Sequence, residues 1–516
     1  MYFCKLGTKV SILYETSKFF LKKTSLYTFN FQLPTFLSTF APLFHIHTYT
    51  HTREEEMRYA IIAAGEGSRL RQEGIAVPKP LIMVNGERLI DRLIRIFTEN
   101  GATEIVVICN GIYPEVAKHL ARRKEEEGLP LKYVVKNTQS SMHSLYEIAP
   151  LLGKEKFVLT TVDTFFDENL FRDYIKAFSK TEADGMMAVT TFCDDEKPLY
   201  VSTDKEGDAI SGFHDSKPEG CKYVSAGIYG LNHKAIATLE RCVKEGQSRM
   251  RNFQRALVAE GIKLTAYPIG KVTDIDHATD IASVQKRIMG IYRAERYSPS
   301  SVEKDHAILD ASMQQLKAKG YAVSTIREED VKAEAYLPQA EAYLSMARSK
   351  EVLELLQDKA CLNPANAVRY CNQRSYITTT EARPPLWIKR ADQCSEQEDD
   401  VVFCPTEADV QRAKNNLQAR GINSYVVQPH HEGEHVKFYG VEKTDFFYPP
   451  GQETLRHCAT EMARKAGLSI YGGDAITGAD GTVSIIDLND FPSFSPCRKE
   501  AAEAIAKRMN IYLANC

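Results

Sequence analysis

Short apolar segments alternate with amphipathic segments in the first half of the chain, from residue 57 onward. The apolar segments have the length and composition of buried parallel strands, and they are residues 59–63, 104–109 and 157–161. Residues 87–97 and 114–124 carry apolar side chains at helical spacing. Repeated strand–helix units predict an α/β fold, with a doubly wound and mostly parallel, Rossmann-like sheet that has helices on both faces.

The pattern changes at residues 298–301, where a Ser-Pro-Ser-Ser sequence interrupts it. A polar-faced helix at 303–320 follows, and then helices and strands come in mixed order. The expected strands are residues 385–389, 424–428, 435–441 and 483–492. We therefore predict a first domain at 57–292, a linker at 293–302 and a second, α+β domain at 303–516.

Residues 1–56 differ in composition from the rest of the chain. No Asp, Glu, Lys or Arg occurs at residues 24–52, and Pro34 and Pro42 interrupt this stretch. A membrane-spanning helix needs about 20 mainly apolar residues, which this stretch does not offer. We interpret residues 1–56 as an extension that is disordered or results from a mis-assigned start. A transit peptide is the alternative, because the first 23 residues carry five Lys and one Glu.

The overall charge and the cysteines narrow the function classes. The formal net charge is −3 and acidic and basic residues are interleaved, so the sequence offers no electrostatic reason to expect a nucleic acid partner. No two of the 12 cysteines have the CxxC spacing of zinc or redox sites. A chain of this length does not depend on disulfides. We predict reduced thiols, a cytoplasmic location and no stable membrane insertion.

A glycine-rich loop follows the first expected strand. The sequence Ala-Gly-Glu-Gly-Ser-Arg-Leu occupies residues 64–70, and Pro-Lys-Pro-Leu follows at 78–81. Glycines let backbone N–H groups approach phosphates closely, and Arg69 and Lys79 add two positive charges. In an open α/β sheet, ligands bind beyond the carboxyl ends of the strands. The loop therefore predicts a nucleotide phosphate site.

These two motifs together resemble the signature of sugar-phosphate nucleotidyltransferases, and the resemblance extends from residue 57 to about 290. Residues 137–145 resemble the segment that contacts the base in choline-phosphate and inositol-phosphate cytidylyltransferases, which favours CTP. The resemblance implies that Arg69 and Lys79 are catalytic. It implies a nucleotide site built from Ala64, Gly65, Gly67, Ser68, Arg69, Lys79 and Ser144.

The same resemblance implies two ligands for Mg²⁺, an ion that prefers oxygen. Asp163 follows a strand, and Asp276 lies in the Asp-Ile-Asp-His-Ala-Thr-Asp sequence at 274–280; Asp274 is the second choice in that segment. The glycine of residues 225–229 resembles one that lies near the acceptor. The alternative is that Asp163 or Asp280 only caps a helix.

The sequence His-Glu-Gly-Glu-His at 431–435 matches a zinc-protease pattern. That pattern binds zinc only on a helix, where both imidazoles lie on one face. Pro429 precedes the segment, Gly433 lies within it, and both flanks have strand character. We predict a hairpin turn here and no zinc site.

An Asp-Leu-Asn sequence at 487–489 ends the last expected strand. Residues i and i+2 of a strand point to the same face, so Asp487 and Asn489 are expected to project together. Asp474 can approach them from a neighbouring strand.

This set resembles the metal site of ATP-grasp enzymes, most closely the inositol polyphosphate kinases and peptide-type ligases. The resemblance implies Mg²⁺ ligands at Asp474, Asp487 and Asn489. It also implies an ATP site with Lys389 and Lys437 near the phosphates and Gln428 near the adenine. Two features depart from that family: Arg374 stands where a Lys is common, and residues 390–400 contain no Gly.

The two halves together predict a bifunctional enzyme. The first half transfers a nucleotidyl group from an NTP to a sugar, alditol or inositol phosphate and releases pyrophosphate. The second half is a kinase or a ligase that uses ATP. The alternative is an active nucleotidyltransferase with a catalytically silent, regulatory ATP-binding domain. A molybdenum-cofactor nucleotidyltransferase fits the first half less well, because residues 137–145 match it less.

Overall fold

The computed structural model describes residues 57–192, 197–204, 208–377, 382–393 and 395–515. The predicted extension at 1–56 lies outside the described residues. The residues from 55 to 516 belong to one unit.

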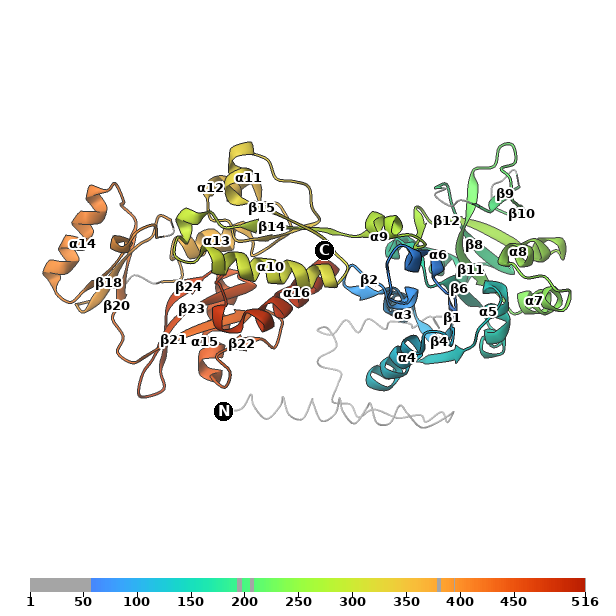
Figure 1. Cartoon of the computed structure of the whole chain (residues 1–516), viewed down its shortest axis with the longest axis horizontal. Helices are drawn as coiled ribbons and strands as arrows, with labels where there is room; N and C mark the ends of the chain where they lie inside the picture. Colours follow the sequence, from blue (N-terminus) through green and yellow to red (C-terminus); the bar gives the residue numbers. More distant parts are fainter. Residues whose placement is uncertain (1–56, 193–196, 205–207, 378–381, 394, 516) are drawn as a thin grey trace, which may run out of the picture. The chain divides into compact units, whose positions relative to one another are not determined.

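A nine-stranded sheet forms the centre of the first half of this unit (Figure 1). Strands β6, β1, β4 and β5 lie side by side in that order and run parallel. They are β1 (Met57–Ala63), β4 (Ala102–Cys109), β5 (Leu131–Val135) and β6 (Phe157–Thr161). The apolar segments predicted as strands at 59–63, 104–109 and 157–161 are therefore confirmed.

Side chains of β1 alternate between two hydrophobic cores. Tyr59 and Ile61 belong to one core, and Ala60 and Ile62 belong to the other. Helices cover both faces, as a doubly wound sheet requires. One core contains side chains from α3 (Leu89–Glu99), α4 (Pro114–Glu127) and α6 (Glu168–Lys180), and the other contains side chains from α5 (Ser141–Ile148), α7 (Lys234–Lys244) and α8 (Met250–Ala259).

The other side of the sheet is mixed rather than parallel. Strand β11 (Tyr223–Leu231) runs antiparallel to β6 and to β8 (Gly185–Thr190). It also pairs with β9 (Tyr200–Thr203), which pairs with β10 (Ile210–His214). Strand β12 (Leu264–Pro268) runs parallel to β8. The predicted parallel arrangement is thus confirmed for the four strands from β6 to β5, beside which the phosphate loop lies.

Short elements decorate this domain. They are α2 (Ser68–Gln72), η2 (Lys79–Leu81), η3 (Ala149–Leu151), α9 (Ala278–Val284), the hairpin of β2 (Met83–Val84) with β3 (Glu87–Arg88), and the pair of β7 (Thr164–Phe166) with β13 (Val272–Asp274).

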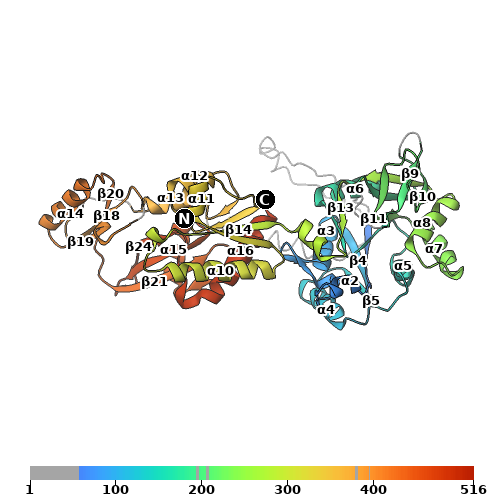
Figure 2. The ribbon, with the colours of Figure 1, turned by 45° about the horizontal axis from the view of Figure 1, so that its top comes forward.

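Three further sheets make up the remainder of the unit (Figure 2). The first is parallel and contains β14 (Arg287–Tyr292), β15 (Ala322–Arg327), β16 (Ala342–Ser345) and β17 (Cys361–Leu362). The second is antiparallel and contains β18 (Leu386–Arg390), β19 (Val401–Cys404) and β20 (Tyr425–Pro429). The third is antiparallel and contains β21 (Glu434–Val441), β22 (Phe447–Tyr448), β23 (Ile470–Thr477) and β24 (Val483–Asn489).

Helices pack against each of these sheets. Helices α10 (Val302–Ala318) and α16 (Arg498–Ala514) lie side by side in both views and share one core with β14, β16 and β21 (Figures 1 and 2). Helix α14 (Glu407–Ala419) covers the second sheet, and α15 (Glu453–Ala466) covers the third. The remaining elements are η4 (Glu295–Tyr297), α11 (Glu328–Glu334), α12 (Lys350–Leu355), α13 (Ala365–Asn372), η5 (Glu398–Asp400) and η6 (Ser495–Cys497).

Two predictions about this region are corrected. The predicted domain boundary at residue 292 falls too late, because β14 pairs with β15 and β16, which both lie after it. Residues 287–292 therefore share a sheet with strands of the second half. Strand pairing across a boundary cannot be read from local apolar patterns.

The predicted hairpin turn at 431–435 is also wrong. Strands do flank the segment, but β20 pairs with β18 whereas β21 pairs with β22 and β23. The segment therefore connects two different sheets, and His435 lies within β21. A hairpin turn and a connection between two sheets both exclude a helix here, so the imidazoles of His431 and His435 do not share a helix face.

The eight cysteines within the described residues are unpaired thiols. In the same part of the chain, no helix combines the length and the apolar character needed to cross a bilayer.

Candidate functional site

The glycine-rich loop turns sharply at the carboxyl end of β1. Gly67 has a φ of 62°, a left-handed conformation that favours glycine, and it caps the start of α2. A Cβ at Gly65 would meet nothing within 4 Å. The backbone beside Gly65 therefore faces open space, where a phosphate could approach its N–H groups.

Asn110 holds this loop in place from the end of the neighbouring strand β4. Its Nδ2 donates to the carbonyl oxygens of Ala64 (3.2 Å) and Gly65 (3.0 Å), and the Asn110 side chain is buried. The Tyr113 hydroxyl donates to the Glu66 carbonyl at 2.9 Å. We did not identify Asn110 from the sequence. Its position directly after a buried parallel strand was the signal that could have found it.

Lys79 stands between two carboxylates at the mouth of the loop. Its Nζ lies 2.6 Å from Asp163 Oδ2 and 2.7 Å from Asp276 Oδ1. Asp163 and Asp276 lie 84 and 197 residues after Lys79 in the sequence, and the fold brings the three side chains together. The Lys79 side chain is 10% exposed, compared with 20% for Asp163 and 41% for Asp276.

The protonation states of this group follow from opposing effects. Burial lowers the pKa of Lys79, but the charges of Asp163 and Asp276 raise it above its ordinary value. Burial raises the pKa of Asp276, and the nearby charges of Lys79 and Arg69 outweigh it, so this pKa lies below its ordinary value. Lys79 is therefore a cation and Asp276 an anion at neutral pH.

Arg69 completes the charged cluster from helix α2. Its Nη1 lies 2.9 Å from Asp276 Oδ2, and half of its side chain remains exposed. Glu73, at the end of the same helix, contacts the opposite segment: its carboxylate accepts from the backbone N–H of Ala278 at 2.6 Å and lies 2.5 Å from His277 Nδ1. The phosphate loop and the acidic segment are thus joined directly.

Asp163 and Asp280 were each considered as a possible helix cap, and the structure distinguishes them. Asp280 accepts from the backbone N–H groups of Asp276 (3.0 Å) and His277 (2.6 Å) and completes the capping box of α9. It therefore fixes the backbone that presents Asp276. Helix α6, which follows Asp163, is instead capped by Asp167. Asp163 does not cap that helix, and its carboxylate points to Lys79.

A divalent cation would fit this group of residues. Asp163 and Asp276 already meet at one positively charged nitrogen. In addition, Asp163 Oδ1 is buried and has no hydrogen-bond partner among the described residues. Two carboxylates with an unsatisfied buried oxygen are suitable ligands for a hard ion such as Mg²⁺.

A hollow of about 360 Å³ extends from this cluster. Its lining includes the loop at 64–67, Lys79, Asp163 and residues 138–141 with Ser144. The Ser144 side chain is buried, and its Oγ lies 2.7 Å from Thr138 Oγ1. Ser144 thus lines the hollow and orders Thr138, while residues 138–141 offer hydroxyl, amide and backbone groups to a ligand.

A second, basic hollow of about 630 Å³ lies on the same domain. Five cationic side chains and one carboxylate line it: Lys197, Lys217, Arg249, Arg251, Arg255 and Asp215. Asp215 holds Arg251 at 2.5 Å and Arg255 at 2.7 Å. Among the described residues the lining of this hollow therefore has an excess of positive charge, and we did not predict the hollow from the sequence.

Tyr229 lies on β11, which pairs with β6. Burial raises its pKa to about 12, and Asp274, Asp163 and Arg251 all lie close enough to affect it. Strand β11, which carries Tyr229, also carries Gly227 at a φ of 72°. Strand β11, which was predicted to lie near the acceptor, pairs with β6, the strand that precedes Asp163.

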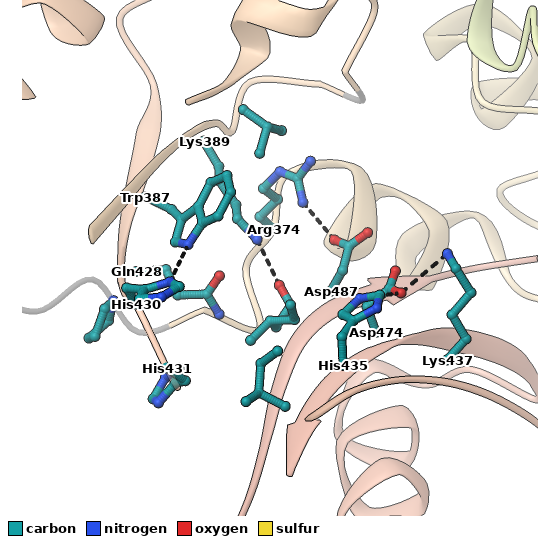
Figure 3. A pocket seen from close by; sticks show the side chains of 14 residues that line it. Arg374, Trp387, Lys389, Gln428, His430, His431, His435, Lys437, Asp474 and Asp487 are labelled. Atoms are coloured by element: carbon teal, nitrogen blue, oxygen red, sulfur yellow. Dashed lines mark hydrogen bonds and ion pairs between the residues drawn. The ribbon is translucent and has the colours of Figure 1, made fainter. Parts of the chain in front are cut away.

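A hollow of about 400 Å³ in the second half of the chain collects all three residues predicted to bind ATP and two of the three predicted metal ligands (Figure 3). Lys389 and Gln428 come from β18 and β20, and Lys437, Asp474 and Asp487 come from β21, β23 and β24. The third predicted metal ligand, Asn489, does not line this hollow. It lines an adjacent one of about 230 Å³, together with Lys437 and Asp474.

Lys389 is buried in this hollow, and no carboxylate of the described residues forms an ion pair with it. Its Nζ donates to the carbonyl of Ile486 at 2.8 Å, and the residue is 5% exposed (Figure 3). Burial lowers the pKa of Lys389 to about 8; Asp487 opposes this shift and Arg374 adds to it. A buried lysine of this kind gains from an incoming anion.

The two carboxylates of this hollow are held by neighbouring cations. Asp487 Oδ1 lies 2.7 Å from Arg374 Nη1 and accepts from the Tyr376 hydroxyl at 2.8 Å. Asp474 Oδ1 lies 2.9 Å from His435 Nε2 and 3.2 Å from Lys437 Nζ. Arg374, which departs from the family pattern, thus contacts a predicted metal ligand directly.

An aromatic group at the edge of this hollow was also absent from the sequence prediction. Trp387, the only tryptophan of the chain, lies on β18 and donates from Nε1 to His430 Nδ1 at 3.3 Å. The rings of Trp387 and Phe403 have centroids 5.1 Å apart.

Throughout the described ranges, no three His, Cys, Asp or Glu side chains are arranged to bind a metal together.

Comparison with known proteins agrees with the geometry of the first half. Residues 59–275 match a protein-family model described as nucleotidyl transferase, and these residues form a domain of that type. The chain is 27% identical over 251 residues to the "Bifunctional IPC transferase and DIPP synthase" of Rubrobacter xylanophilus, which is 46% of this chain and 53% of that protein.

Two further proteins are similar over shorter or more divergent regions. The choline-phosphate cytidylyltransferase of Streptococcus pneumoniae is 31% identical over 118 residues, 23% of this chain and 49% of that protein. The structure of the inositol-1-phosphate CTP transferase from T. maritima covers 44% of this chain and 91% of its own, at 20% identity and a TM-score of 0.38. The chain spans about half the length of the curated relatives it matches.

Proposed function

We propose that the first domain transfers a nucleotidyl group, preferably from CTP, to a sugar, alditol or inositol phosphate and releases pyrophosphate. The observation that carries this proposal is the convergence of Lys79, Asp163 and Asp276 beside the glycine-rich loop. The similarity to a choline-phosphate cytidylyltransferase supports the choice of CTP.

The residues of this site have distinct tasks in that reaction. The backbone at Gly65 and Gly67 cradles the triphosphate, and the hollow lined by residues 138–141 receives the nucleoside. An oxygen of the acceptor phosphate attacks the α-phosphorus, and the bond to the β-phosphate oxygen breaks. Lys79 and Arg69 stabilise the negative charge that develops on the phosphates. No covalent intermediate with the protein is needed.

Asp163 and Asp276 would hold Mg²⁺, which neutralises phosphate charge so that one anion can attack another. The basic hollow of Lys197, Lys217, Arg249, Arg251 and Arg255 supports an acceptor that already carries a phosphate. Its excess of positive charge attracts such an anion and raises its local concentration.

Phosphorus NMR on the full-length chain would test this proposal. Each NTP is incubated with Mg²⁺ and a set of polyol and sugar phosphates. We expect a diphosphate ester and pyrophosphate with CTP and at least one acceptor. If Lys79→Ala released pyrophosphate as fast as the wild type, the site would have been assigned wrongly.

For the second half we propose an ATP-dependent transfer reaction, by a kinase or a ligase. The observation that favours it is the convergence of Lys389, Gln428, Lys437, Asp474 and Asp487 on one hollow from two sheets. Asp474 and Asp487 face each other across the β23–β24 pair, which suits a shared Mg²⁺.

A silent, regulatory domain is the competing function for this half. It is motivated by the Arg374–Asp487 ion pair, which uses a carboxylate that the reaction needs. Fluorescence of Trp387 can report ATP binding, while coupled assays report ADP. If ATP binds and ADP forms, the result supports an ATP-dependent enzyme. If ATP binds but none of the tested acceptors leads to ADP, the result supports a regulatory domain.

A further inference from the structure

The adjacent hollow of about 230 Å³ shares a wall with the hollow that Lys389 lines. Lys437 and Asp474 line both of them, and these two residues oppose each other in the β21–β23 pair. A group bound in the smaller hollow therefore lies next to a nucleotide bound in the larger one. This is the position of an acceptor.

The charged side chains around the smaller hollow are paired with one another. Arg293 Nη1 lies 2.8 Å from Asp305 Oδ2, and its Nη2 donates to the Phe491 carbonyl at 2.8 Å. Arg348 Nη2 lies 2.6 Å from Asp490 Oδ1.

The third cation, Lys437, lies 3.2 Å from Asp474 Oδ1. Each cation of the smaller hollow therefore faces a carboxylate. Two of these carboxylates, Asp305 and Asp474, belong to the lining, and the third, Asp490, lies directly behind it, so three negative charges offset three positive ones.

Several uncharged groups complete this lining. They are the side chains of Ser298, Ser301, Ser493, Tyr439 and Asn489. Hydroxyl and amide groups both donate and accept hydrogen bonds, while the paired carboxylates accept and the guanidinium groups donate. Such a surface matches a ligand rich in hydroxyl groups, because each hydroxyl also donates and accepts.

The basic hollow of the first domain provides the contrast. Five cations and one carboxylate line it, so it favours a ligand with negative charge. In the smaller hollow of the second half, each of the three cations is paired with one carboxylate. This hollow is also smaller than typical sites for drug-sized ligands, which span about 300–1,000 Å³, so it suits a compact acceptor.

We infer that the second half phosphorylates a compact, uncharged polyol held in the smaller hollow, and that its product is the class of phosphate ester that the first domain activates. This inference rests on the ATP-dependent function proposed above. It goes beyond it by naming the acceptor class and by selecting a kinase over a ligase.

The reaction balances with ATP and the polyol alone. A polyol hydroxyl oxygen attacks the γ-phosphorus of ATP, and the bond from that phosphorus to the β,γ-bridging oxygen breaks. The hydroxyl proton leaves to water. The products are ADP and a polyol phosphomonoester, which has gained the negative charge that the basic hollow of the first domain favours.

A ligase reaction fits the charge pattern less well. A ligase first phosphorylates a carboxylate, so its acceptor enters as an anion. In the smaller hollow that anion would have to compete with Asp305 or Asp490 for an arginine that each already pairs with. Breaking a buried pair leaves one partner uncompensated, which is unfavourable.

The test compares three groups of acceptors with the full-length chain, Mg²⁺ and ATP. They are neutral polyols (myo-inositol, hexitols and pentitols), their monophosphates, and sugar acids of similar size. We expect ADP and a new phosphomonoester, seen by phosphorus NMR, with a neutral polyol only. ADP formed with a sugar acid or a monophosphate, and not with a neutral polyol, would overturn the inference.

Measuring ATP binding by Trp387 fluorescence distinguishes failure of the proposed ATP-dependent function from failure of the acceptor inference alone. If ATP does not bind, the proposed ATP-dependent function fails and the acceptor inference fails with it. If ATP binds but no neutral polyol is phosphorylated, the acceptor inference fails while the nucleotide site stands.

A pair of serine variants locates the acceptor. Ser298 lines the smaller hollow, whereas Ser300, two residues away, is exposed and lies outside that lining. Ser298→Leu should raise the KM for the polyol about tenfold or more, because added methylenes fill the hollow, and leave ATP affinity unchanged. The matched control Ser300→Leu should change neither. An unchanged polyol KM in Ser298→Leu would refute binding in this hollow.

Discussion

Two buried lysines, Lys79 and Lys389, show how differently the two proposed sites are prepared for a nucleotide. Lys79 lies between Asp163 and Asp276 at 2.6 and 2.7 Å. Lys389 donates to the backbone carbonyl of Ile486, and no carboxylate of the described residues lies at hydrogen-bond distance from its Nζ. The pKa of Lys79 is raised, whereas burial lowers that of Lys389 to about 8.

The difference follows from the charges around each lysine. Two carboxylates that share one ammonium keep Lys79 charged before any ligand arrives. They also form a pair of oxygen ligands that a divalent cation can use. Asp474 and Asp487 raise the pKa of Lys389 too little to offset its burial, so the negative charge of a bound polyphosphate would further favour its charged form. The first lysine has its carboxylate partners before any ligand binds, whereas in our proposal the nucleotide supplies the partner of the second.

Removal of the Asp163 carboxylate should cause the largest loss of activity at the first site. We expect Asp163→Ala to lower the rate of pyrophosphate release by about 10³-fold, since it removes both a carboxylate partner of Lys79 and a proposed metal ligand. The measurement is initial rate with saturating CTP and acceptor. Asp167→Ala is the control, because Asp167 caps α6 without joining the cluster. Its rate should stay near wild type, and an equal loss in both variants would point to misfolding instead.

The second site should respond to loss of its lysine at the level of binding. Lys389→Met should weaken ATP binding about tenfold or more, because a charge-assisted contact to phosphate is removed. Titration calorimetry or Trp387 fluorescence would measure the affinity. Lys499→Met, an exposed change on α16, serves as the matched control. Unaltered ATP affinity in Lys389→Met would show that the nucleotide binds elsewhere, while pyrophosphate release should be normal in both variants.

Alkaline pH should separate the two sites. Lys389 has a pKa of about 8, below its ordinary value, so in the nucleotide-free protein it is mostly charged at pH 7 and mostly neutral at pH 9. ATP favours the charged form, so its affinity should fall as pH rises, by up to about tenfold between pH 7 and 9.

Lys389→Arg should remove most of this dependence, because arginine stays protonated throughout the range. The pKa of Lys79 is raised rather than lowered, so CTP binding should not weaken in parallel. Equal pH dependence at both sites would contradict the contrast drawn between the two lysines.

The smallest effect is expected at Asn110. Asn110→Ala removes two hydrogen bonds that hold the carbonyl groups of the phosphate loop. Each such bond contributes about 1 kcal/mol, so we expect the KM for CTP to rise several-fold with a smaller change in kcat. Asn100→Ala, at the end of α3, is the control because its side chain bonds only within that helix region. A KM for CTP that is unchanged in Asn110→Ala would mean that the loop holds its shape unaided.

Local sequence was sufficient for much of the first domain. Apolar runs such as 157–161 determined the strands, because a buried parallel strand needs nearly continuous apolar side chains. The loop at 64–70 indicated the end of the sheet where the structure gathers Lys79, Asp163 and Asp276. The residues Lys79, Asp163 and Asp276 were selected from motif order, and the structure brings them together.

The remaining errors and omissions share one cause, which is long-range pairing. The boundary at 292 failed because β14 finds its partners after that point. The predicted hairpin at 431–435 failed because its two flanking strands pair in different sheets. Asn110 and the basic hollow were missed because single polar residues acquire a role only through neighbours from other segments.

The sequence by itself determined which segments become strands, where glycine permits a tight turn, and which ionisable residues are available. Those properties depend on local sterics and on the period of apolar side chains. Only the tertiary structure decided that Lys79 has two carboxylate partners while Lys389 has none at hydrogen-bond distance in the described part of the chain. It also decided that, among the same residues, one hollow carries excess positive charge while the cations of another each face a carboxylate. Charge balance and burial depend on distances between segments far apart in the chain, and folding alone sets those distances.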